Sequence, residues 1–111
     1  MRRVWLKQEM GAAILANKKT ATTRKHPLPL GPETARTFPR FKAVSFAVLE
    51  ILDSIETKPS KVIGEFYRAE GFNSPEEMVD FMLKEDLRLD EREPCYFHPF
   101  KLLERLAELE A

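Results

Sequence analysis

A short segment near the N-terminus, residues 14–24, brings together side chains that could bind or attack a polar substrate. Its sequence is Ile-Leu-Ala-Asn-Lys-Lys-Thr-Ala-Thr-Thr-Arg, and its last seven residues carry three cations and three hydroxyls. Cations attract anionic groups, and a threonine hydroxyl becomes a nucleophile when a neighbouring base removes its proton. Much later in the chain, Glu70 supplies a carboxylate directly before Gly71. These two segments hold the side chains best suited to chemistry.

The elements around the first segment follow from its pattern. Apolar residues at three- and four-residue spacing predict a helix over about residues 9–16, and residues 4–6 predict a first strand. Asn17 suits the left-handed position just past a helix end. From Thr20 the period is two, so Thr22 and Arg24 share one face of a predicted strand and Thr23 lies on the other. The face with Thr22 is either a pocket wall or a solvent-exposed strand face.

The middle of the chain predicts a loop followed by a central strand. Residues 25–40 contain four prolines and no apolar period, which predicts a loop that could close over an anionic ligand. Residues 41–55 are nearly continuous in apolar side chains and predict the central strand or strand pair. Their apolar parity switches between Val48 and Leu49, which indicates a bulge or sharp bend.

The second half predicts two helices, a strand and a final helix. Pro59 suits the start of a helix that Gly71 would end. Ser74 and Glu77 predict a capping box at the start of the next helix, so Glu70 would occupy the corner between the two helices. Residues 95–100 predict the last strand, and four leucines within residues 102–110 predict a short C-terminal helix that packs on the barrel or on a second subunit.

Composition places the chain among ordinary globular domains. With 111 residues, 43% hydrophobic and 32% charged, we expect a single domain over residues 1–111 with its core at about residues 4–102. No apolar run is long enough to span a bilayer, the N-terminus has no signal-peptide pattern, and a lone cysteine, Cys95, suits a reducing compartment. These observations predict a cytoplasmic protein.

The formal net charge is zero, but its distribution is uneven. Residues 1–42 hold ten Lys or Arg and only two acids, so the remaining residues hold eight cations and sixteen acids. A basic half could attract phosphate, or the two halves could simply neutralise each other on a mixed surface. His26, His98 and Cys95 lack metal-ligand spacing, so we expect no metal and no cofactor.

With these residues laid out, the chain resembles the ASCH domain family of the PUA-like superfamily. The resemblance lies in residues 14–24, in Glu70-Gly71-Phe72 and in the helix start at residues 74–77. It implies an α+β fold: a small, mostly antiparallel PUA-like β-barrel with flanking helices. Asn17 replaces the usual glycine, and the Gly-Asp pair that often opens the next strand in the family is present only as Gly31-Pro32.

The resemblance also implies candidate functions. The family is proposed to bind RNA or nucleotides, and some small members remove the acyl group from acetylated cytidine with a Lys, a Thr and a Glu. By motif these catalytic residues fall on Lys19, Thr22 and Glu70. Lys19 could activate Thr22 if burial lowers the pKa of its ammonium, whereas a tight pair with Glu70 would keep the lysine charged.

Three functional hypotheses follow. The first is a module that binds RNA or a nucleoside, the second is an amidohydrolase acting on acylated cytidine, and the third is a homodimer formed through the C-terminal helix. Trp5 could stack on a base, as could Tyr96, although aromatic residues of small barrels also serve as core. The predicted ligand-binding residues are Lys18, Arg24, Lys25, Trp5 and Arg40.

Overall fold

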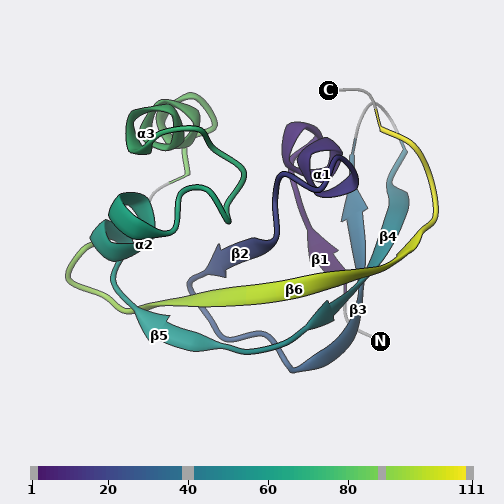
Figure 1. Cartoon of the computed structure of the whole chain (residues 1–111), viewed down its shortest axis with the longest axis horizontal. Helices are drawn as coiled ribbons and strands as arrows, with labels where there is room; N and C mark the ends of the chain where they lie inside the picture. The colour runs from purple at the N-terminus through teal and green to yellow at the C-terminus, as the bar shows by residue number, and fades with distance from the viewer. Residues whose placement is uncertain (1–2, 39–41, 88–89, 110–111) are drawn as a thin grey trace.

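The fold is built on one strongly curled sheet with three helices beside it, as seen in the computed structural model (Figure 1). The structure describes residues 3–38, 42–87 and 90–109. The elements in chain order are β1 (Arg3–Trp5), α1 (Gln8–Leu15), β2 (Ala21–Arg24), β3 (Gly31–Thr37), β4 (Val44–Ile51), β5 (Ile55–Thr57), α2 (Pro59–Glu65), α3 (Pro75–Lys84) and β6 (Cys95–Arg105).

The sheet is a mixed half-barrel. Its strand order is β1-β3-β4-β6-β2, with β5 also paired to β6. Among the strand pairs of the described residues, β1–β3 is parallel and the others are antiparallel. The long strand β6 runs along the molecule (Figure 1). Its C-terminal half pairs with β4, and its N-terminal half pairs with β2 and β5. The prediction of a small, mostly antiparallel α+β barrel with flanking helices is confirmed.

Two apolar clusters lie on either side of this long strand. The first joins α1 to the sheet, and its buried members are Ile14, Ala35, Phe46, Ala47, Leu49, Ile51 and Phe100. The second joins α2 and α3 to the other end, and its buried members are Ala21, Val62, Phe72, Met78, Cys95 and Phe97. The thiol of Cys95 is buried in this second cluster, and burial raises its pKa. Between them, the clusters fix α1, β2 and the α2–α3 corner relative to one another.

Several local predictions are confirmed. The helix α1, the strand β2 and the central position of β4 agree with the sequence pattern. The register between β4 and β6 shifts between Val48 and Leu49, where the apolar parity switches. Ser74 accepts a hydrogen bond from the Glu77 backbone N–H at 3.1 Å, as a helix cap should. The Glu77 carboxylate accepts from Asn73, so the reciprocal half of the capping box is not formed.

The prediction of a loop over residues 25–40 is wrong, because residues 31–37 form β3. Gly31-Pro32 opens this strand, and Gly31 has a φ of 105° that suits glycine. The buried positions of β3 are Glu33, Ala35 and Thr37. Because two of these three side chains are polar, the strand carries no apolar alternation that sequence analysis could detect.

The helix that begins at Pro59 ends earlier than predicted, at Glu65, and turns lead from there to Gly71. The C-terminal helix predicted over residues 102–110 is also wrong in its described part. Residues 102–105 continue β6, where Leu102 pairs with Leu49 and Arg105 with Ala47. The edge of β4 that faces away from β3 supplies backbone partners for the extended chain of β6, and the leucine spacing fits either structure. The hypothesis of a dimer through that helix therefore loses its basis.

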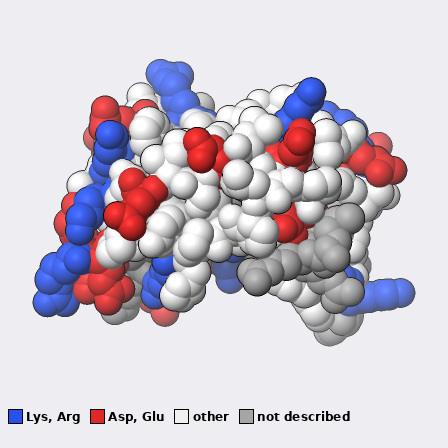
Figure 2. All heavy atoms as spheres, turned by 90° about the horizontal axis from the view of Figure 1, so that it is seen from below, with Lys and Arg blue, Asp and Glu red and all other residues white. Residues whose placement is uncertain are grey.

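The surface mixes charges of both signs. Figure 2, which views the molecule from below, shows basic and acidic side chains next to one another at both ends of this face. The uneven distribution along the sequence therefore does not produce a single-sign surface here. None of the helices among residues 3–38, 42–87 and 90–109 is long and apolar enough to cross a membrane.

Candidate functional site

The turn after α1 places Lys19. Asn17 has a φ of 61°, which confirms its predicted left-handed conformation. The backbone N–H of Lys18 donates to the carbonyl of Ala13 at 2.9 Å, and that of Asn17 donates to Ile14 at 3.0 Å. These two bonds form a Schellman motif, which ends the helix and reverses the chain. The following residue, Lys19, enters the interior and is only 4% exposed.

The corner between α2 and α3 places Glu70 against this turn. The carbonyl of Ala69 accepts from the backbone N–H groups of Thr20 (2.7 Å) and Ala21 (3.0 Å), which joins the corner to the start of β2. Gly71 has a φ of 104°, and a Cβ at this position would lie 3.2 Å from the Cβ of Lys19. The close approach leaves the Glu70 side chain, 4% exposed, directed at β2.

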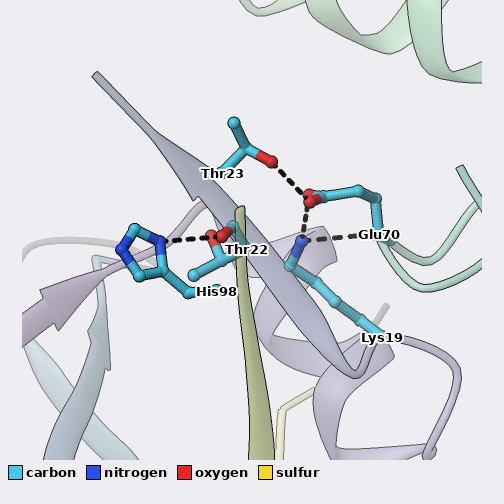
Figure 3. A network of polar contacts seen from close by, with 5 residues as sticks. All are labelled: Lys19, Thr22, Thr23, Glu70 and His98. Atoms are coloured by element: carbon cyan, nitrogen blue, oxygen red, sulfur yellow. Dashed lines mark hydrogen bonds and ion pairs between the residues drawn. The ribbon is translucent and has the colours of Figure 1, made fainter. Parts of the chain in front are cut away.

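Lys19, Glu70 and Thr23 form a buried polar network (Figure 3). The Lys19 ammonium donates to the Glu70 carboxylate Oε1 at 3.0 Å and to the Glu70 backbone carbonyl at 3.2 Å. The Thr23 hydroxyl donates to the other carboxylate oxygen at 2.7 Å. Burial lowers the pKa of Lys19, the Glu70 carboxylate opposes this shift, and the nearby Arg24 adds to it. The site therefore holds a desolvated lysine and a carboxylate whose two oxygens each accept a side-chain hydrogen bond.

This network lines a pocket at the open side of the half-barrel. The pocket has a volume of about 640 Å³, and its walls come from both ends of the strand order, β1 with the end of β3 on one side and β2 on the other. Its polar side is formed by Lys19, Thr22, Thr23, Arg24 and Glu70. Its apolar side is formed mainly by Trp5, Leu6, Phe38, Phe72, Phe81, Met82 and Leu87. A pocket lined by both polar and apolar side chains suits an amphipathic small molecule.

The other predicted ligand-binding residues divide into three groups. Trp5 and Lys25 line the pocket, and both are exposed. Lys18 is exposed but lines a different hollow between α1 and α3, so it does not join this site. Arg40 lies outside the described residues. Tyr96 is half-buried on β6, and its hydroxyl donates to the carboxylate of Glu56.

Thr22 lies in the pocket wall in a different arrangement from Thr23. Thr22 is 4% exposed, and its hydroxyl makes no hydrogen bond to any residue in the described part of the chain. Its backbone carbonyl accepts from Nδ1 of His98 at 3.1 Å. The backbone N–H of Leu28 donates to Nε2 of the same ring at 2.9 Å, so the neutral ring carries its proton on Nδ1. Thr22 is therefore held by its backbone, and its hydroxyl is left for a ligand.

Sequence analysis missed Thr23, Thr37 and His98. Period-two alternation placed Thr23 on the opposite face from Thr22, but the free edge of β2 allows both to line the pocket. Thr37 lies in β3, where the sequence pattern predicts a loop. His98 is fully buried behind β2, and no pattern in the sequence distinguishes such a residue from an exposed one. The described residues contain no group of His, Cys, Asp and Glu side chains arranged to hold a metal ion.

Comparison with known proteins adds information on the fold. No family model and no curated protein sequence matches this chain. A protein of Enterococcus faecalis described with the family model DUF984 superposes with a TM-score of 0.62 at 16% identity, covering 95% of this chain and 78% of that one. A mutant of ZmASCH from Zymomonas mobilis gives a TM-score of 0.61 at 16% identity, covering 94% and 73%.

A third solved structure, an ASCH domain from Lactobacillus crispatus, gives a TM-score of 0.58 at 13% identity and covers 91% of this chain and 79% of that one. Such low identities establish the architecture and nothing about activity. Because the similarity extends over the curled sheet, the helices and the segments that form the pocket, this chain has the fold of an ASCH domain.

Proposed function

We propose that the pocket binds a nucleoside, either free or at the end of an RNA chain. One observation carries the proposal: a single pocket of about 640 Å³ combines the buried Lys19–Glu70 pair with the exposed aromatic rings of Trp5 and Phe38. This volume lies within the range of about 300–1,000 Å³ that is usual for small-ligand sites. A nucleobase needs both kinds of contact, an aromatic face for stacking and polar groups at its edge.

Trp5 is well suited to the stacking role. The ring is 45% exposed although it belongs to a strand, and the guanidinium of Arg36 lies 5.2 Å from the ring centroid. A cation over one ring face restrains the indole. Phe38, 58% exposed, lines the same side of the pocket. The apolar wall therefore offers aromatic surface to a base.

Calorimetric titration with cytidine tests this proposal. Trp5→Leu is expected to weaken binding by about 5- to 150-fold, because stacking on an aromatic side chain contributes about 1–3 kcal/mol. Leu52→Ala is the matched control, since Leu52 is 52% exposed and does not line the pocket. No measurable binding of any nucleoside, or an unchanged affinity in Trp5→Leu, would contradict the proposal. Binding only to RNA, with a steep salt dependence, would point to the backbone and away from the base.

Hydrolysis of an acylated cytidine is the second candidate function. Two observations favour it: burial lowers the pKa of Lys19, and the Thr22 hydroxyl lines the same pocket. In this mechanism neutral Lys19 takes the hydroxyl proton while the Thr22 oxygen attacks the acyl carbon. The carbon–nitrogen bond then breaks, the exocyclic nitrogen of the base receives the proton from Lys19, and water hydrolyses the resulting ester.

The Glu70 carboxylate both helps and opposes this chemistry. It orients the ammonium in the pocket at 3.0 Å, but it also favours the charged form of the lysine, which cannot act as a base. A chromatographic assay with acetylcytidine tests the candidate. Cytidine formed by the wild type and lost in Lys19→Ala, Thr22→Ala and Glu70→Ala would support it. An absence of product at high enzyme concentration and long incubation would contradict hydrolysis of this substrate.

A further inference from the structure

The pocket contains a cation, Arg24, that forms no ion pair with any carboxylate of the described residues. Arg24 lies at the end of β2 and lines the pocket beside the Lys19–Glu70 pair. Within the part of the chain that the structure describes, its guanidinium has no carboxylate within ion-pair distance, and its Nε is buried without a hydrogen-bond partner. A guanidinium stays protonated in a protein, so a half-buried Arg24 brings an uncompensated positive charge into the site.

The Glu70 carboxylate is directed at other donors and forms no ion pair with Arg24. Its Oε1 accepts from Lys19, and its Oε2 accepts from Thr23 at 2.7 Å. The carboxylate attracts Arg24 only at longer range, where it partly offsets the effect of burial, which lowers the pKa of the guanidinium. The buried part of the pocket therefore holds two cations and one carboxylate.

A second unsatisfied group lies in the wall formed by β3. Thr37 is 1% exposed, its Oγ1 has no hydrogen-bond partner in the described part of the chain, and it lines the same pocket. Buried polar atoms of native proteins are nearly always hydrogen-bonded, so two unpaired donors in one pocket favour a ligand that supplies oxygen acceptors. Two further buried atoms of the described residues have no partner, Glu33 Oε2 and Arg36 Nε, and neither residue lines the pocket. The charge of the lining agrees in sign, because the residues that line the pocket include four cations (Lys7, Lys19, Arg24, Lys25) and two carboxylates (Glu70, Asp86). One of these cations, Lys7, forms an exposed ion pair with Glu85 at 3.8 Å.

We infer that the ligand carries an oxyanion bound by Arg24, with the Thr37 hydroxyl as a further donor in the same pocket, and that the natural ligand is a nucleoside monophosphate and not a neutral nucleoside. The inference rests on the proposed function, since it assigns the second part of the same ligand. An arginine fork matches a phosphate with two parallel, charge-assisted hydrogen bonds. The Lys19–Glu70 pair and the aromatic wall then remain for the base, so each part of the ligand meets groups of matching chemistry.

Calorimetric titration with cytidine and with cytidine 5′-monophosphate, at one fixed ionic strength, tests the inference. The wild type is expected to bind the nucleotide about tenfold more tightly or better, because a charge-assisted pair is roughly twice as strong as a neutral hydrogen bond. Arg24→Gln is expected to bring the two affinities together, mainly by weakening the nucleotide. Arg24→Lys keeps the charge without the fork and should give an intermediate ratio. Lys101→Gln, an exposed cation on β6 outside the pocket, should leave the ratio unchanged.

Equal affinities in the wild type, or a preference for the nucleotide that survives Arg24→Gln, would overturn the inference. If neither compound binds, the proposed function fails, and the oxyanion subsite is tested separately with inorganic phosphate. The NMR resonance of the Arg24 Nε–H should then shift saturably, because this proton has no partner in the free protein. Such a shift would keep the subsite with a different ligand, and its absence would overturn the subsite too.

Discussion

The ammonium of Lys19 lies 3.0 Å from the carboxylate of Glu70, with the two side chains only 4% and 5% exposed. The residues are 51 positions apart in the sequence, and the pair joins the turn after α1 to the corner between α2 and α3. Desolvation of two charges offsets much of their attraction, so such a pair contributes little to net stability. Its clearer effect is to fix one donor group at a set position in the wall of the pocket.

Removing one partner of this pair should be costly. Glu70→Gln leaves the Lys19 ammonium buried without a counter-charge, and we expect the free energy of unfolding to fall by about 3–5 kcal/mol. Urea denaturation measures this change. Glu65→Gln, an exposed carboxylate on α2, is the matched control and should change the stability by no more than about 0.5 kcal/mol. Equal urea midpoints for Glu70→Gln and Glu65→Gln would show that the Lys19–Glu70 pair does not stabilise the corner between α2 and α3.

The two glycines of this region should respond in opposite directions to alanine. Gly71 has a φ of 104°, and a Cβ there would lie 3.2 Å from the Lys19 Cβ, so Gly71→Ala should destabilise the fold by about 1–3 kcal/mol. Gly64 lies within α2 with open space around it, so Gly64→Ala should stabilise the fold by about 0.5–1 kcal/mol. Thermal unfolding of the two variants measures both effects. A similar loss in both would indicate general intolerance of the region.

Local patterns predicted the parts of the fold that depend on neighbours in the sequence. The helix before Asn17, the bulge beside Val48 and the cap at Ser74 each have a signal within a few residues, and each is confirmed. The strand β3 has no such signal because its core-facing positions include Glu33 and Thr37. Thr37 lines the pocket, and sequence periodicity does not report such a role.

The candidate site was harder to predict than the elements that carry it. The approach of Lys19 and Glu70 depends on how the α2–α3 corner packs against β2, and the expectation came from the family resemblance, since no spacing rule spans 51 residues. Period-two alternation assigns Thr23 to the face opposite Thr22, so it does not predict the hydrogen bond of Thr23 to Glu70. Because β2 is an edge strand, Glu70 reaches Thr23 from beside the sheet. Whether these residues bind or catalyse stays a prediction.

The buried histidine should make stability depend on pH. Burial lowers the pKa of His98, Arg24 acts in the same direction, and Glu70 and the hydrogen bond to Thr22 oppose it. Because the folded pKa lies below the unfolded value of about 6.5, the contribution of His98 is complete above that pH and is lost as the pH falls from there through the folded pKa. Protonation of Nε2 would also break the hydrogen bond from Leu28, because the new N–H of the ring would face the backbone N–H of Leu28.

Urea denaturation at several pH values between 8 and 5 checks this expectation. The stability difference between the wild type and His98→Asn should be largest at pH 8 and should shrink as the solution is acidified. His26→Asn is the matched control, since His26 is the other histidine of the chain and is exposed. A difference between wild type and His98→Asn that stays constant over this range would mean that His98 keeps the same protonation in both states.

The two threonines of β2 provide the sharpest separation of binding from catalysis. The Thr23 hydroxyl is committed to Glu70 at 2.7 Å, whereas the Thr22 hydroxyl has no partner in the described residues and is available to a substrate. If the pocket hydrolyses acetylcytidine, Thr22→Val should reduce kcat by at least about 100-fold with little effect on stability, because the nucleophile is lost and the shape is kept. Thr23→Val should instead lower stability by about 1–3 kcal/mol, since a buried carboxylate oxygen loses its donor, and should preserve most of the turnover. Initial rates and urea midpoints measured on both variants distinguish the outcomes.

The opposite pattern, with activity lost only in Thr23→Val, would identify Thr23, which already contacts Glu70, as the nucleophile. If both variants keep full activity, neither threonine attacks the substrate, and water activated in the pocket becomes the nucleophile.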